Sequence, residues 1–166
     1  MRLIRLLTPL LALPLVLPLA GCGIDTSTTA PPEFKDSGVV ETTTFAPGLG
    51  IDINAAGWTK TTNGLYYRQV IPPSATAAQV VDGQNVTVNY AGFLVNGVQF
   101  DAGQFSFVLG AGKVVAGFEQ GVEGMHVGER RLLLVPAALG YGAAGAGNAI
   151  PPNATLIFVV EVVSAT

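Results

Sequence analysis

The side chains that most often carry enzyme chemistry are scarce in this chain of 166 residues. It has one histidine, His126, and one cysteine, Cys22, which is too few ligands for a zinc site. It has no G-x-S-x-G turn that would present a nucleophilic serine. The stretch GYGAAGAG, residues 140–147, lacks the Lys-Ser/Thr pair of a phosphate-binding loop and does not open a helix. The sequence therefore predicts no metal, no cofactor and no covalent catalysis.

The same glycine-rich stretch indicates a different kind of site. It runs through Ile150-Pro151-Pro152 into ATLIFVVEVV, residues 154–163, which is typical of a strand buried on both faces. Glycines allow the chain ahead of that strand to bend sharply. A loop that feeds a core strand is a common way to build a pocket, so we expect a binding pocket beneath residues 140–150.

The charge balance excludes one class of ligand. The formal net charge is −3 and the pI is about 4.9, whereas nucleic-acid binding needs a basic face. The one adjacent basic pair, Arg130 and Arg131, lies in an expected strand and should point to opposite sides of it. We expect no nucleic-acid partner.

The N-terminus has the layout of a secretory signal. Arg2 and Arg5 precede a leucine-rich run, residues 6–19, which is short and broken by prolines for a membrane span. It ends in LAGC, which resembles the lipobox of bacterial lipoproteins and predicts cleavage after residues 1–21, with a lipid carrying palmitate on Cys22. The alternative is an ordinary signal peptide with a chance cysteine. The lipobox interpretation places the protein in the cell envelope, exported and anchored to a bacterial membrane on its periplasmic or outer face.

The next segment shows no sustained hydrophobic period. Residues 23–56 are rich in Thr, Ser, Pro and Gly, a composition typical of a flexible linker. We therefore expect residues 22–57 to form a lipidated cysteine and a disordered tether. The alternative is that FAPGLGIDI, residues 45–53, docks on the domain or on a partner.

From Trp58 onward the pattern predicts a sheet with one short helix. The helix is expected in GFEQGVEGM, residues 117–125, and Asn96-Gly97 between apolar residues is a strong hairpin signal. At about 109 residues, the segment 58–166 is long enough for one hydrophobic core. Strands are expected at residues 64–71, 85–94, 104–110, 129–136 and 154–163, where apolar residues alternate or run together.

Over residues 58–166 the motifs and their order resemble the FKBP-type peptidyl-prolyl cis-trans isomerases. The motifs are YAG, GVQFD, FSFVLG, VVAGFEQG, MHVGE, YG and IPPNATLIFVVE, in this order. The resemblance implies an α+β fold, in which a curved antiparallel β-sheet wraps around one short α-helix with an apolar pocket between them. It also implies isomerase activity on proline-containing polypeptides, binding of macrolide inhibitors, and a monomer.

The resemblance also assigns the site. It implies that Tyr90, Asp101, Tyr141 and Phe118 are the catalytic residues, with the Val115 N–H and the Tyr141 hydroxyl as donors to substrate carbonyls. Asp101 is expected to orient Tyr90 or to face the twisted carbonyl. The implied substrate-binding walls are Phe100, Phe105, Val114, Val115, Ile150 and Phe158.

Three departures from the family pattern bear on activity. Phe118 stands where tryptophan is frequent. Only three residues, AGQ, separate Asp101 from Phe105, which leaves the position of Phe105 open. Ala146 and Ala149 are small where the family often has a large residue, which predicts a more open pocket. Two hypotheses therefore remain: a prolyl isomerase for exported proteins, or a binding module for unfolded or partner chains with little turnover.

Overall fold

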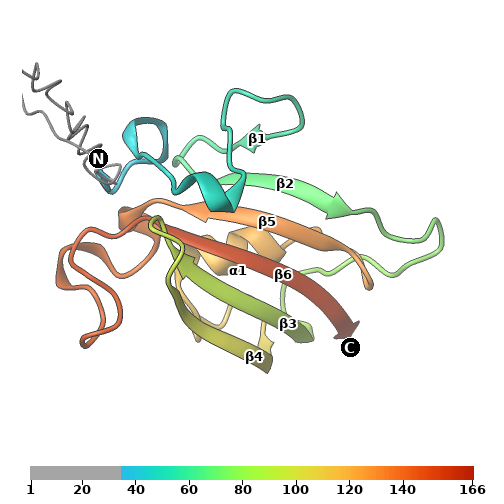
Figure 1. Ribbon diagram of the computed structural model, residues 1–166. Helices are drawn as coiled ribbons and strands as arrows, with labels where there is room; N and C mark the ends of the chain where they lie inside the picture. The colour runs from blue at the N-terminus through green and yellow to red at the C-terminus, as the bar shows by residue number, and fades with distance from the viewer. Residues whose placement is uncertain (1–34) are drawn as a thin grey trace, which may run out of the picture. The chain divides into compact units, whose positions relative to one another are not determined.

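One antiparallel sheet organises the chain (Figure 1). The structure is a computed structural model and describes residues 35–166. The strands lie in the order β1-β2-β5-β6-β3-β4 and all neighbours are antiparallel. Their bounds are β1 Thr59–Lys60, β2 Tyr66–Ile71, β3 Asn85–Leu94, β4 Gln99–Val108, β5 Arg130–Val135 and β6 Leu156–Ala165, with one α-helix, α1 Ala116–Val122. The fold class expected from the sequence, a sheet around one short helix, is confirmed.

The β3–β4 hairpin forms where the Asn-Gly signal predicted it. Gly97 has φ of +87°, which a residue without a Cβ adopts at little cost. The Asn96 side chain accepts a hydrogen bond from the Val98 N–H at 3.0 Å. Strand β4 starts five residues earlier than expected, because residues 99–103 continue the pairing with β3.

Helix α1 packs on β5 through two glycines. A Cβ added to Gly117 would lie 2.4 Å from Val135 Cγ1, and one added to Gly121 would lie 2.4 Å from Leu133 Cδ1. Residues four apart share one face of a helix, so this glycine face brings the helix backbone onto the sheet. This close approach sets how near Phe118 lies to the sheet, because Phe118 lies between the two glycines in the sequence.

The adjacent arginines lie on opposite faces of β5, as predicted. Arg130 pairs with Glu161 on the neighbouring strand. Arg131 donates to the carboxylate of Glu129, which is 1 % exposed. It also donates to the carbonyl of Gly121 within the last turn of α1 and to that of Gly124 beyond the helix. Arg131 thus satisfies carbonyls that a helix end leaves without partners, and it ties the end of α1 to the sheet.

The sheet separates two apolar clusters. The larger cluster lies on the α1 side and includes Leu133 and Val135 of β5 with Phe158 and Val160 of β6. The smaller cluster lies on the opposite face and includes Leu134 of β5, so successive residues of that strand serve different clusters.

The smaller cluster is completed by residues ahead of β1. Val40 is fully buried against Leu134 and Ile157. Further along, four apolar side chains at irregular spacing pack against the same cluster: Phe45, Leu49, Ile51 and Ile53. The flexible tether expected at residues 22–57 therefore does not describe residues 35–57, and the docking alternative for residues 45–53 is what the structure shows.

Three predictions concern residues that the structure does not describe. The signal peptide at residues 1–21, the lipidated Cys22 and the linker at residues 23–34 lie outside residues 35–166. Among the helices of the described part, none has the length and apolar character needed to cross a membrane.

Candidate functional site

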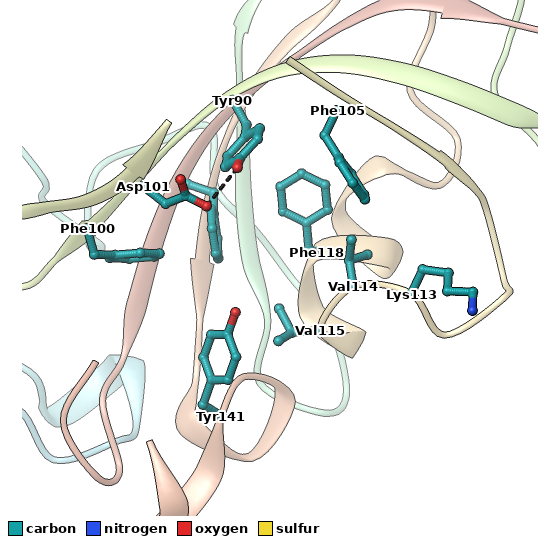
Figure 2. A pocket seen from close by; sticks show the side chains of 10 residues that line it. Tyr90, Phe100, Asp101, Phe105, Lys113, Val114, Val115, Phe118 and Tyr141 are labelled. Atoms are coloured by element: carbon teal, nitrogen blue, oxygen red, sulfur yellow. Dashed lines mark hydrogen bonds between the residues drawn. The ribbon is translucent and has the colours of Figure 1, made fainter. Parts of the chain in front are cut away.

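An open hollow lies between the sheet, the start of α1 and the long loop that connects β5 to β6 (Figure 2). Its volume is about 240 Å³. Ten residues line it: Tyr90, Phe100, Asp101, Phe105, Lys113, Val114, Val115, Phe118, Tyr141 and Phe158. Most of this lining is aromatic or aliphatic, with two charged side chains and two phenol groups, which is typical of a site that binds an apolar group and orients it by a few polar contacts.

Phe118 forms the floor of the hollow at the first turn of α1. Its ring is 6.1 Å from the Tyr90 ring and 5.2 Å from the Phe158 ring, both in edge-to-face geometry. Phe100 packs edge-on against Phe158 at 5.7 Å. Four aromatic rings from β3, β4, α1 and β6 therefore converge on one hollow, and they belong to residues that the resemblance assigned to the site.

Gly92 makes room for two of these rings. A Cβ at this position would lie 2.5 Å from Phe100 Cζ and 3.0 Å from Phe158 Cε1. The YAG motif contained this glycine, but it was not among the site residues predicted from the sequence. Its part in the site becomes visible only when the register places Phe158 opposite it on β6.

Tyr90 and Asp101 form the polar edge of the hollow. The Tyr90 hydroxyl donates to Asp101 Oδ2 at 2.7 Å (Figure 2), and the Ala102 N–H donates to Asp101 Oδ1 at 2.9 Å. The hydrogen bond to Asp101, partial burial and the negative charges nearby raise the pKa of Tyr90 from 10.0 to about 12. Tyr90 is therefore a neutral donor at physiological pH, and its proton is directed at Asp101.

Two further hydrogen-bond donors belong to residues that line the hollow. Val115 is the N-cap of α1, and its backbone N–H has no acceptor among residues 35–166. Tyr141 comes from the opposite side, on the β5–β6 loop, with its hydroxyl toward the hollow (Figure 2). These are the two donors that the resemblance implied, and both belong to residues that line the hollow.

The short AGQ segment does not displace Phe105. Strand β4 runs through it with regular pairing to β3, and Phe105 lies in the lining, stacked on Phe107 at 6.0 Å. Phe105 is 43 % exposed, so this wall is open to solvent.

Ile150 and Lys113 differ from expectation. Ile150 was expected in the wall, but it is not among the residues that line the hollow. It is buried in the main core, and its backbone forms an isolated antiparallel bridge with Ala146, which closes the loop on itself. Lys113 lies at the rim and was missed, because an exposed lysine beside a glycine has no pattern that distinguishes it from ordinary surface.

The site has the groups for binding and orientation. Within residues 35–166, no three His, Cys, Asp or Glu side chains come together in a way that could hold a metal ion. What the hollow offers is an apolar floor, neutral donors at its edges and one carboxylate already engaged by Tyr90. Such a site can hold a small apolar ring and fix the carbonyls beside it.

Comparison with protein families gives a match over most of the sheet and the site. The family model for the FKBP-type peptidyl-prolyl cis-trans isomerases matches residues 70–163. FK506-binding protein 1 of Dictyostelium discoideum is 51% identical over 87 residues, which are 49% of this chain and 81% of that protein. An FK506-binding protein of Neisseria meningitidis is 46% identical over 88 residues, which are 50% of this chain and 81% of that protein.

Solved structures show the same fold. The crystal structure of a peptidyl-prolyl cis-trans isomerase from Pseudomonas syringae superposes with a TM-score of 0.62 at 27% identity, covering 68% of this chain and 84% of that one. The crystal structure of FkpA from Escherichia coli superposes with a TM-score of 0.60 at 33% identity, covering 68% of this chain and 53% of that one. Sequence and fold thus point to one family.

Proposed function

The chain belongs to the FKBP-type peptidyl-prolyl cis-trans isomerase family, and we propose on that basis that it accelerates rotation about Xaa–Pro peptide bonds in exported polypeptides. The uncatalysed rotation crosses a barrier of about 18–20 kcal/mol and takes tens to hundreds of seconds. No covalent bond is made or broken, so the reaction needs no nucleophile, metal or proton shuttle.

A site catalyses this rotation when it binds the twisted amide more tightly than either planar form. Twisting removes the amide resonance and leaves the carbonyl less polar. Transfer from water to an apolar hollow costs the twisted form less than the planar forms, because the planar forms lose stronger hydration. Donors that hold the neighbouring carbonyls add to the effect by fixing the geometry of the chain around the rotating bond.

The convergence of four aromatic rings beside two unengaged donors is the observation that carries the proposal. The prolyl ring lies on Phe118, between the rings of Tyr90 and Phe158. The Val115 N–H donates to a substrate carbonyl on one side, and the Tyr141 hydroxyl donates on the other. Asp101 holds the Tyr90 hydroxyl at 2.7 Å and keeps that ring in place as a wall.

A protease-coupled assay on a short Xaa–Pro peptide tests this function. The full chain, purified in detergent, should raise the cis-to-trans rate above background, and an FK506-type macrolide should compete with the peptide for the hollow. Tyr141→Phe should lower kcat/KM by about fivefold, the effect of losing one net hydrogen bond. The matched control is Val98→Ala at the exposed β3–β4 turn, which should leave kcat/KM unchanged.

The alternative is a binding module built on the same hollow. It is favoured if the full chain gives no rate above background while it still binds unfolded protein, and if Phe118→Leu changes only that binding. The open wall at Phe105 and the small Ala146 and Ala149 side chains would suit such a module.

The location in the cell envelope is part of the same proposal, and it depends on Cys22. Labelled palmitate should be incorporated into the wild-type chain, and Cys22→Ser should move the protein from the membrane fraction to the soluble fraction. A Cys22→Ser chain that still sediments with membranes, together with an unlabelled wild type, would remove the lipid anchor from the proposal.

A further inference from the structure

The N-terminal strap, residues 36–46, lies outside the segment that the family model matches, yet it contacts both ends of the loop that carries Tyr141. That loop, residues 136–155, connects β5 to β6. In Figure 1 the strap, coloured blue to cyan, lies near the base of this orange loop. The contacts between the two segments bear directly on how Tyr141 is held.

The first contact is at the start of the loop. The Ala137 N–H donates to the Gly38 carbonyl at 3.0 Å, and Ala137 is buried. Gly38 has φ of +72°, and a Cβ there would lie 3.2 Å from Ala137 Cβ. Glycine is therefore required at this position for both its backbone conformation and its close approach.

The second contact is at the end of the loop. The Thr155 N–H donates to Asp36 Oδ2 at 2.8 Å, and Thr155 is fully buried. The other oxygen of the same carboxylate accepts from the Gly38 N–H at 3.0 Å. One carboxylate thus fixes the turn of the strap and the end of the loop together, through hydrogen bonds to a charged acceptor, which are the stronger kind.

A short chain of contacts leads from the strap to Tyr141. Asn153 is the one non-glycine residue with positive φ, at 57°, among residues 35–166. A Cβ on Gly38 would lie 2.9 Å from the Asn153 carbonyl oxygen, so the strap packs directly on this peptide. The Asn153 N–H donates at 2.8 Å to the carbonyl of Gly142, the residue after Tyr141.

The strap is itself fixed to the sheet. Val40 is fully buried in the cluster with Leu134 and Ile157. The Ala46 N–H donates to the Val95 carbonyl at 2.8 Å, which joins the far end of the strap to the β3–β4 turn. The loop is therefore held against an element that the sheet core already holds in place.

We propose that the strap positions Tyr141 for the isomerase reaction, with Asp36 and Gly38 as positioning residues. The inference rests on the proposed function for its catalytic consequence. Loss of the Asp36 carboxylate frees the end of the loop, lets the Asn153 peptide relax and lets Tyr141 leave the edge of the hollow. The donor is then absent for part of the time, while the apolar floor at Phe118 is unchanged.

The test is a double-mutant cycle in the full chain. Asp36→Ala should lower kcat/KM by about fivefold in the wild-type background, the effect expected for one net hydrogen bond. In a Tyr141→Phe background, the same change should lower kcat/KM less than about twofold, because the group that it positions is already absent. Gly38→Ala, which acts through the other contact, should repeat this pattern. The control is Glu41→Gln on the same strap, whose carboxylate binds Lys60 and Tyr66 instead of the loop, and it should leave kcat/KM unchanged.

Amide hydrogen exchange provides a readout that does not depend on activity. Asp36→Ala should speed exchange in peptides covering residues 137–155 and leave α1 unchanged. Equal losses of kcat/KM in the two backgrounds, or unchanged exchange in residues 137–155, would overturn the proposal. If the wild-type chain has no isomerase activity, the proposed function fails. In that case two measurements still test the positioning role of the strap: the amide exchange, and the same double-mutant cycle with the affinity for a proline-containing peptide measured in place of kcat/KM. Equal losses of affinity in the wild-type and Tyr141→Phe backgrounds would overturn the proposal.

Discussion

At the residue scale, the protonation of Tyr90 depends chiefly on one neighbour, Asp101. Its hydroxyl donates to Asp101 at 2.7 Å, and this hydrogen bond is the largest of the effects that raise its pKa to about 12. A tyrosine held in this way is neutral throughout the physiological range and cannot serve as a base. Its contribution is the ring, which forms a wall of the hollow against Phe118.

We predict that Asp101→Asn returns the pKa of Tyr90 from about 12 toward its ordinary value of 10.0, because the charged acceptor is lost. The measurement is an NMR titration of the chain labelled with ¹³C at the tyrosine Cζ. Tyr66 is the internal control, since burial and Glu41 raise its pKa and neither changes in the variant. A Tyr90 signal that still titrates near pH 12 in Asp101→Asn would contradict this explanation.

The sign of the pH dependence follows from the raised pKa. The folded state favours the protonated phenol, so the stability contributed by the Tyr90–Asp101 hydrogen bond is fully present below pH 10. It is lost as the pH rises from about 10 through about 12. The difference in stability between wild type and Asp101→Asn should therefore be constant near neutral pH and shrink only in this alkaline window.

The site residues that lie on regular elements are those that the family resemblance brought to the hollow. The resemblance to the FKBP-type family assigned Tyr90, Asp101 and Phe158, which lie on strands, and Phe118, which lies on a helix, and all four line the hollow. Ile150 lies in a loop of glycines and alanines, where no periodicity tells which side chain turns inward.

At the element scale, the contact between α1 and β5 depends on glycines in place of larger side chains. Helix propensity alone would favour alanine over glycine by about 1 kcal/mol. Here the sheet lies so close that a Cβ on Gly121 would be 2.4 Å from Leu133 Cδ1. Packing therefore outweighs propensity, and the helix keeps two glycines in seven residues.

Gly121→Ala should destabilise the protein by about 1–3 kcal/mol, the range for forcing an extra methyl group into a packed core. Urea denaturation monitored by circular dichroism measures the change. Gly103→Ala on β4 is the matched control, since nothing lies within 4 Å of its Cβ position, and it should be neutral or slightly stabilising. A stabilised Gly121→Ala variant would show that the sheet shifts freely away from the helix.

The strands show where the sequence pattern was sufficient. Strand β3 was predicted with its observed bounds, because Val86 and Val88 alternate with polar residues and fill the core. Strand β1 has two residues, Thr59 and Lys60, both exposed, so it offers no apolar pattern at all. Strand β1 forms because it pairs with β2, and the pattern of its own residues does not predict that pairing.

At the scale of the whole molecule, the domain boundary is set by burial on the far face of the sheet. The family model begins at residue 70, and sequence composition suggested a boundary at residue 58. No hydrophobic period marks the segment ahead of residue 58. Its apolar residues, Val40 and Phe45 among them, lie at irregular spacing outside long helices or strands, and each packs on the sheet separately. Their shared partner, the cluster with Leu134 and Ile157, becomes apparent only in three dimensions.

A truncation series tests this boundary. A chain of residues 35–166 should unfold cooperatively, whereas a chain of residues 58–166 should be less stable by several kcal/mol, because burying Val40 alone is worth about 1.5–3 kcal/mol and the partly buried Phe45, Leu49, Ile51 and Ile53 add to it. Differential scanning calorimetry of both chains measures the loss, and 1-anilinonaphthalene-8-sulfonate fluorescence should rise in the shorter chain as the face around Ile157 is exposed.

Val40→Asp in the 35–166 chain should reproduce most of the loss of stability. The matched control is Val39→Asp, at a neighbouring residue that is 49 % exposed, and it should not. Equal stability of the two chains would mean that the sheet retains its own core without residues 35–57 and that the boundary at residue 58 is correct for stability.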